Sequence, residues 1–153
     1  VAEGKIQVIW QTGKYYEREM REFLAQHPTA NIWQGAFIDR MDYAYAAADL
    51  VVSRSGACTV SELCLVAKPT LFVPSPNVAE DHQTKNAMAL VAKDAAICVS
   101  DAQAPATVIA TALETVADNE RMALLAANIR RLAMPDAADT IAREVVRLAR
   151  QGR

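Results

Sequence analysis

A short polar segment that follows an apolar run carries most of the chemistry in this sequence. Leu50-Val51-Val52 leads into Arg54-Ser55-Gly56, and a helical pattern begins directly afterwards. Unpaired N–H groups at a helix start, together with the helix dipole, favour an anion such as a phosphate. Because Gly56 has no Cβ, a ligand can approach the backbone there. The residue types and their order therefore predict an anion site at this turn.

Two side chains of the following helix, Thr59 and Glu62, lie one helical turn apart and face the same way. A carboxylate close to a phosphate site can accept hydrogen bonds from both hydroxyls of a ribose. The same spacing also fits a capping box, in which the two side chains bond amides of the helix end and no ligand is involved. Spacing alone leaves both interpretations open.

A second polar group, Gln83 and Asn86, also lies at a spacing that shares one helix face. Their amides offer both donors and acceptors, which suits an array of sugar hydroxyls. The alternative is a polar first turn that is capped by Asp81. His82, directly before Gln83, is a possible general base, but its place in the first turn leads us to expect ligand contact or solvent instead.

These segments must be positioned by short β-branched runs that alternate with longer helical patterns. The alternation predicts βαβ units and a Rossmann-like α/β fold, a parallel sheet with helices on both faces, as a single domain over residues 1–153. In such sheets, ligands bind beyond the carboxyl ends of the strands. Strands are expected at residues 5–10, 31–37, 50–52, 69–73 and 95–99, and helices at 15–26, 42–48, 58–67, 81–92 and in the remainder, where Pro135 divides the last two.

Composition excludes several classes of function. The chain has a formal net charge of -2, and a mildly acidic chain is a poor candidate for binding nucleic acid, which requires a basic stripe. It has no apolar run near the roughly 20 residues of a membrane-spanning helix. Cys58, Cys64 and Cys98 show no CxxC spacing. We expect them to be small buried hydrophobes in a reducing cytoplasm, and not disulfides or zinc ligands.

The block from Asp49 to Glu62 resembles the donor-site motif of the MurG family. These bacterial transferases move N-acetylglucosamine from UDP onto lipid I, the membrane-anchored peptidoglycan precursor. Residues 37–41 upstream, and residues 69–74 and 81–87 downstream, match at the family's spacing, so the resemblance covers essentially the whole chain. It implies the C-terminal half of a GT-B glycosyltransferase, UDP-N-acetylglucosamine as the ligand, and no metal or cofactor.

The resemblance also implies a role for individual residues. Backbone amides near the start of the helix at 58–67 would meet the diphosphate and the sugar, and Glu62 would bond the uridine ribose. Phe37 and Ile38 would form the uracil site, whereas a buried strand end is the alternative for them. Gln83 and Asn86 would select N-acetylglucosamine, and His82 departs from a family that often has glutamine there. The full predicted donor site is Phe37, Ile38, Arg54, Ser55, Gly56, Ala57, Cys58, Thr59, Val60, Ser61, Glu62, His82, Gln83 and Asn86.

The family's enzymes have two Rossmann-like domains, and every matching residue belongs to the second. We therefore expect that the opening strand with its glycine-rich turn, and the N-terminal acceptor domain, are absent from this chain. That domain would supply the lipid I site, the contact with the cytoplasmic face of the inner membrane, and the general base. The full-length protein would be an inverting hexosyltransferase, and this fragment alone would be inactive.

Two other functions fit the same residues. A related UDP-sugar transferase with another lipid acceptor would share the donor motifs, because the other half reads the acceptor. A soluble donor-binding subunit of a two-chain transferase is the third possibility, and the expected absence of the opening strand argues against it. The surrounding reading frame separates these cases, since an upstream Rossmann half supports a single-chain enzyme and a stop codon supports a subunit.

Overall fold

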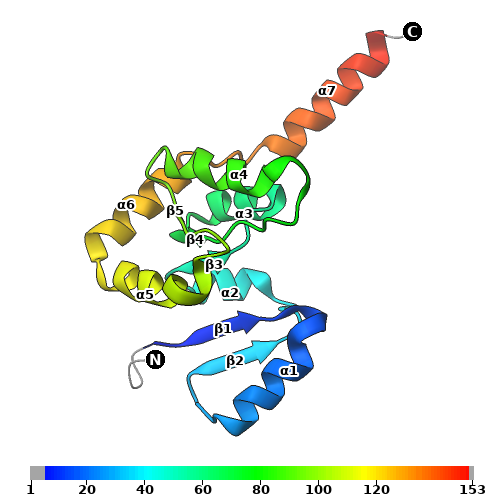
Figure 1. The fold of residues 1–153 in the computed structure, drawn as a ribbon. Helices are drawn as coiled ribbons and strands as arrows, with labels where there is room; N and C mark the ends of the chain where they lie inside the picture. Colours follow the sequence, from blue (N-terminus) through cyan, green and yellow to red (C-terminus); the bar gives the residue numbers. More distant parts are fainter. Residues whose placement is uncertain (1–5, 152–153) are drawn as a thin grey trace. The chain divides into compact units, whose positions relative to one another are not determined.

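A computed structural model gives the structure of residues 6–151 (Figure 1). The chain divides into two compact units between Ala47 and Ala48. In both units parallel strands alternate with helices, which confirms the predicted α/β class. The single-domain prediction stays a prediction, and so does the expected absence of an opening strand. Residue 5 of the first predicted strand lies outside the described residues.

The first unit is a two-stranded parallel sheet with helices. It contains β1 (Val8–Gln11), α1 (Gly13–Gln26), β2 (Ile32–Gly35) and α2 (Met41–Ala47). Val8 lies opposite Ile32 in the β1–β2 register. Gly13 has a φ of +73°, a conformation that other residues adopt only with strain, and it lets the chain turn from β1 into α1. None of residues 6–47 is buried, so this unit has no core of its own.

The second unit holds three parallel strands in the order β3–β4–β5, with Val51 opposite Thr70 and Leu71 opposite Ile97. Figure 1 draws α3 and α4 above these strands and α5 below them. Pro135 lies between the last two helices, as predicted. The elements are β3 (Val51–Ser53), α3 (Ala57–Val66), β4 (Thr70–Phe72), η1 (Ala79–Asp81), α4 (His82–Val91), β5 (Ile97–Cys98), α5 (Ala104–Ala117), α6 (Asn119–Arg130) and α7 (Ala137–Gln151).

The core of the second unit lies around β4. Thr70, Leu71 and Phe72 are completely buried, as are Leu63 on α3 and Ile129 on α6. Helix α3 packs against both α4 and α6, and α4 packs against β5. Because protein interiors are close-packed, these contacts fix where the N-termini of α3 and α4 lie relative to the strand ends.

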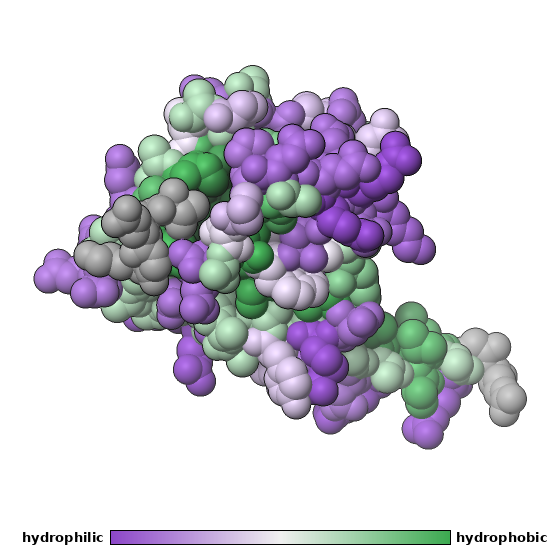
Figure 2. All heavy atoms as spheres, turned by 90° about the horizontal axis from the view of Figure 1, so that it is seen from below, coloured by the Kyte–Doolittle hydropathy of each residue, from purple (hydrophilic) through white to green (hydrophobic). Residues whose placement is uncertain are grey.

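Helix α7 is amphipathic and keeps its apolar face exposed. Ile141, Val145 and Leu148 are all more than half exposed, and Figure 2 shows hydrophobic side chains gathered on this helix, in the arm at the lower right. Its polar face carries the ion pairs Arg143–Asp139 and Arg147–Glu144. In the described part of the chain, no helix is both long and apolar enough to cross a bilayer.

Candidate functional site

The turn after β3 is held by helix α4 through Ser55, which is completely buried. The Ser55 N–H donates to Oε1 of Gln83 at 3.3 Å, and its hydroxyl donates to the backbone carbonyl of Gln83 at 2.7 Å. Its carbonyl accepts from Nδ2 of Asn86 at 3.0 Å. Every polar group of this buried residue is therefore satisfied, and three residues that the sequence predicted for one site do lie together.

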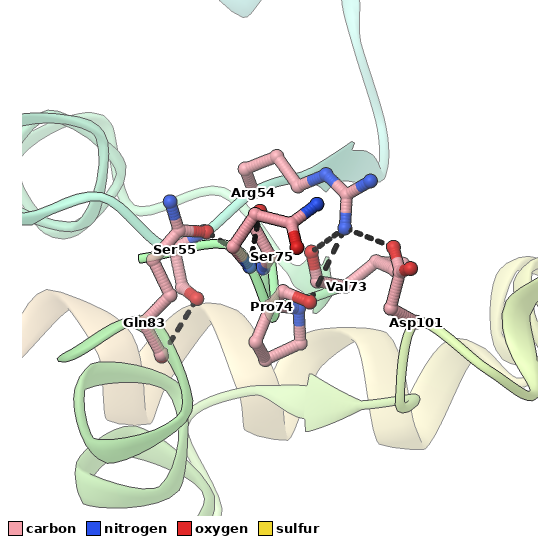
Figure 3. A network of polar contacts seen from close by, with 8 residues as sticks. Arg54, Ser55, Val73, Pro74, Ser75, Gln83 and Asp101 are labelled. Atoms are coloured by element: carbon pink, nitrogen blue, oxygen red, sulfur yellow. Dashed lines mark hydrogen bonds and ion pairs between the residues drawn. The ribbon is translucent and has the colours of Figure 1, made fainter. Parts of the chain in front are cut away.

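The Gln83 side chain joins a second loop to this turn. Its Oε1 also accepts the backbone N–H of Ser75, in the loop after β4, at 2.9 Å (Figure 3). Asp81 precedes α4 with a φ of 53°, and among the described residues its side chain makes no capping hydrogen bond. The alternative in which Asp81 caps a merely polar first turn is therefore wrong.

Helix α3 begins at Ala57, with Gly56 at the capping position. Its first internal hydrogen bond joins the Val60 N–H to the Gly56 carbonyl at 2.9 Å. The N–H groups of Ala57, Cys58 and Thr59 thus have no acceptor within the helix. No side chain among residues 6–151 caps this end. The capping-box interpretation is wrong, because Thr59 lies inside the first turn and not before it.

The space beside this helix start is open. A Cβ at Gly56 would meet no atom of the described residues within 4 Å apart from those of its chain neighbours, Ser55 and Ala57. Glu62 is exposed, Thr59 and Val60 are half-buried, and the Ser61 hydroxyl donates to the Ala57 carbonyl at 3.0 Å. There is therefore room for an added group beside Gly56, at the residue that precedes the amides of α3.

Arg54 connects the carboxyl ends of all three strands of the second unit. Its Nη1 donates to the carbonyls of Val73 and Pro74 at 3.1 Å and 3.2 Å, and it forms an ion pair with Asp101 (Figure 3). The guanidinium is about half exposed, so a positive charge stands at the edge where ligands bind in parallel sheets. Asp101 was not predicted, because a lone Asp after a strand carries no signal until the fold pairs it with Arg54.

A cavity of about 460 Å³ lies beside this network, at the loops that follow β4 and β5. Asp101 is shared by the cavity and the Arg54 ion pair, whereas none of the residues predicted for the donor site lines it. The lining residues are Pro74, Pro76, Asp81, Thr84, Met88, Cys98, Ser100, Asp101 and Ala102.

His82 starts α4 and is exposed, with Nε2 3.8 Å from a carboxylate oxygen of Glu80. Its neighbour along the chain therefore faces it with a negative charge, and both side chains stand in solvent. The exposed position of His82 agrees with one of its two expected places, solvent, and its contact with a ligand stays a prediction.

Phe37 and Ile38 follow β2 in the first unit. Phe37 is 65 % exposed, so the alternative of a buried strand end is wrong for it. The Ile38 N–H donates to Oε1 of Gln11 at 3.0 Å. Gln11, at the end of β1, was not predicted, and it occupies the backbone N–H of Ile38, one of the two residues predicted for the uracil site. The Ile38 carbonyl and the exposed Phe37 ring remain for that role.

The three cysteines differ in their surroundings. Cys64 is buried and Cys98 half-buried, and burial raises the pKa of both thiols. Cys58, at the start of α3, is exposed, so the expectation that it is a buried hydrophobe is wrong. Within the described residues, no cluster of three His, Cys, Asp or Glu side chains is arranged to hold a metal ion.

Comparisons with known proteins agree with this geometry. A chain of Parabacteroides distasonis is 53% identical over 143 residues, 94% of this chain, and one of Bacteroides fragilis is 54% identical over 147 residues, 95% of this chain. Both are named UDP-N-acetylglucosamine--N-acetylmuramyl-(pentapeptide) pyrophosphoryl-undecaprenol N-acetylglucosamine transferase. This chain spans 39% of the length of each.

Solved structures give the same fold. The crystal structure of Acinetobacter baumannii MurG superposes with a TM-score of 0.80 at 29% identity, over 92% of this chain and 43% of that one. The glycosyltransferase VinC in complex with dTDP superposes with a TM-score of 0.68 at 16% identity, over 99% and 43% of the two chains, which shows the fold alone. The profile of the glycosyltransferase family 28 C-terminal domain matches residues 1–141, and the chain belongs to that family.

Proposed function

We propose that this chain is the donor-binding domain of a transferase that moves N-acetylglucosamine from UDP-N-acetylglucosamine to lipid I, forming lipid II for peptidoglycan. The observation that carries the proposal is the uncapped start of α3, where free amides face open space beside Gly56. The names of relatives that are more than half identical over nearly the whole chain support this donor and acceptor.

Each part of the donor has a matching feature. The amides of Ala57, Cys58 and Thr59 would hold the diphosphate, since a helix N-terminus favours anions. Glu62, exposed on the same helix, would bond the ribose hydroxyls. In the first unit, the exposed Phe37 ring would cover the uracil, and the Ile38 carbonyl would accept from its N–H.

The rest of the reaction would use residues outside this chain. Inverting transfer requires a base that deprotonates the acceptor hydroxyl and electrostatic stabilisation of the leaving UDP. The free amides of α3 would supply part of that stabilisation. An N-terminal domain would provide the base, the lipid I site and the contact with the cytoplasmic face of the inner membrane.

Two measurements test the proposal. The intact protein that contains this chain should transfer labelled sugar from UDP-N-acetylglucosamine to lipid I, whereas the 153-residue chain alone should not. Titration of the intact protein with UDP-N-acetylglucosamine, UDP-glucose and UDP-galactose should show the tightest binding for the first. Equal affinity for all three would contradict the sugar assignment, and transfer by the isolated chain would contradict the assignment of the base to another domain.

A further inference from the structure

The orientation of the Gln83 side-chain amide is fixed by chemistry. A backbone N–H can only donate a hydrogen bond, and the Gln83 amide receives two of them, from Ser55 and Ser75. The atom between these two N–H groups must therefore be the oxygen. Among residues 6–151, the Gln83 Nε2 makes no hydrogen bond, so the group that this side chain retains for a ligand is a donor.

Asn86 has the opposite polarity. Its side chain meets the backbone carbonyl of Ser55, which can only accept, so the atom at 3.0 Å must be Nδ2. The oxygen Oδ1 is the group left over, and it is an acceptor. Two amides on one face of α4 therefore present one donor and one acceptor.

The residue that both amides hold is buried and precedes the free amides of α3. Ser55 has no exposed surface, and Gly56 with Ala57 follows directly. A buried donor or acceptor that loses its partner is costly, so the turn keeps its shape only while α4 supplies these bonds. Ser55 can therefore influence a ligand only through the turn that it holds.

We propose that Gln83 and Asn86 are positioning residues, which lock Ser55 and thereby aim the free amides of α3. We further infer that Gln83 offers the donor sugar only an N–H and Asn86 only an oxygen. The inference rests on the proposed function for the identity of the ligand. The locking role rests on the contacts alone.

Two substitutions at Gln83 separate the two roles. Gln83→Glu keeps an oxygen between the Ser55 and Ser75 N–H groups but replaces the outward donor by an acceptor. Gln83→Leu removes both. In the intact protein, we expect Gln83→Glu to keep the hydrogen-exchange protection of the Ser55 and Ser75 amides while its KM for UDP-N-acetylglucosamine rises about tenfold, the loss of roughly one good hydrogen bond. Gln83→Leu should lose the protection as well.

The converse change is Asn86→Asp, which keeps the outward oxygen but sets a carboxylate against the Ser55 carbonyl. In the Asn86→Asp variant, the Ser55 amide should exchange its hydrogen faster than in the wild type. Saturating UDP-N-acetylglucosamine should restore the hydrogen-exchange protection of this amide. Asn119→Asp, at the exposed start of α6, adds the same charge away from the turn and should leave exchange and KM unchanged.

The outcomes are distinct. If Gln83→Leu keeps the Ser55 and Ser75 protection, the positioning role is overturned. If Gln83→Glu keeps the wild-type KM, the assigned polarity is overturned. If the wild-type protein transfers no N-acetylglucosamine, the proposed function fails, and the exchange measurements still decide the positioning role.

Discussion

At the scale of one residue, Gly56 raises the question of why no side chain stands at the start of α3. Its φ of -62° is available to any amino acid, so the backbone does not require glycine there. Apart from its chain neighbours, a Cβ would also meet no atom of the described residues within 4 Å. Neither conformation nor packing explains the missing side chain, and we propose access of a ligand to the α3 amides as its reason.

We therefore predict that Gly56→Ala weakens binding of the donor but has little effect on the stability of the fold. The free energy of unfolding should change by about 1 kcal/mol at most, the scale of a capping-position substitution. The KM for UDP-N-acetylglucosamine should rise at least about tenfold, because a methyl group enters the path of the diphosphate. Denaturant unfolding and donor kinetics measure the two effects, and an unchanged KM would contradict the site.

Cys58 lies at the same helix start and gives a chemical test. Thiolates react with alkylating agents, and burial raises the pKa of Cys64 and Cys98, so their thiolates form only at higher pH than that of a free thiol. Iodoacetamide near pH 8 should modify the exposed Cys58 first, as peptide mass spectrometry can show. UDP-N-acetylglucosamine should slow the labelling of Cys58 and leave that of Cys98 unaffected. Equal labelling with and without the donor would count against a ligand at this helix start.

The polar segments of the site could be predicted from the sequence, but their partners could not. Gln83 and Asn86 stand out by their spacing, whereas the Arg54–Asp101 pair joins residues 47 positions apart and exists only after folding. The capping-box alternative was wrong because the sequence does not determine which residue begins α3. A shift of the capping position by three residues, from Thr59 to Gly56, places Thr59 in the first turn.

At the scale of elements, the helix ends explain how α3 and α4 are placed. Ala67 follows α3 in the left-handed region, with a φ of 55° and a ψ of 36°. Its N–H bonds the Cys64 carbonyl, and the Lys68 N–H bonds that of Leu63, which together form a Schellman motif. The motif ends α3 at Val66, and β4 begins at Thr70.

Because alanine is strained in that region, Ala67→Gly should stabilise the protein. The strain of a left-handed alanine is about 1–2 kcal/mol, and glycine gives back about 0.5–1 kcal/mol through its freer unfolded chain. We expect the free energy of unfolding to rise by roughly 0.5–1 kcal/mol, as measured by denaturant titration. Gly13→Ala places alanine at a φ of +73° and should have the opposite sign. A fall in stability for Ala67→Gly would contradict the strain argument.

Periodicity predicted the order of the elements and most of their extents, yet it missed the break ahead of α4. The prediction of one helix over residues 81–92 did not include the turn at Glu80 and Asp81, whose φ values are 51° and 53°. Consecutive left-handed residues other than glycine are uncommon and leave no pattern in the sequence. The start of α4 at His82 sets where Gln83 points.

At the scale of the whole molecule, the two units differ in how much they bury. Residues 6–47 include no buried side chain, whereas the second unit encloses Leu71, Phe72 and Ile129 completely. A pair of strands with little buried apolar surface is marginally stable by itself. Local stability should therefore differ along the chain.

Hydrogen exchange of the 153-residue chain, followed by mass spectrometry, measures this difference. Amides of β1, β2 and α1 should exchange faster than those of β4 and α6, because opening the second unit exposes a packed core. The amides of α7 serve as an internal reference for an exposed helix, since its described residues include none that is buried. Uniform exchange across both units would contradict the prediction.

The Arg54 network has a consequence for mutational tolerance. One nitrogen, Nη1, carries two protons but faces three acceptors, two of them backbone carbonyls that no substitution can remove. Loss of the Asp101 carboxylate would leave both protons in use, whereas loss of Arg54 removes the donor of both carbonyl bonds at once. A saturation library selected for transfer activity should therefore accept many residues at position 101 and, at position 54, few that lack a long side chain with a cationic donor. Because two of the three acceptors are backbone carbonyls, the network tolerates substitution of Asp101 but depends on the side chain at position 54.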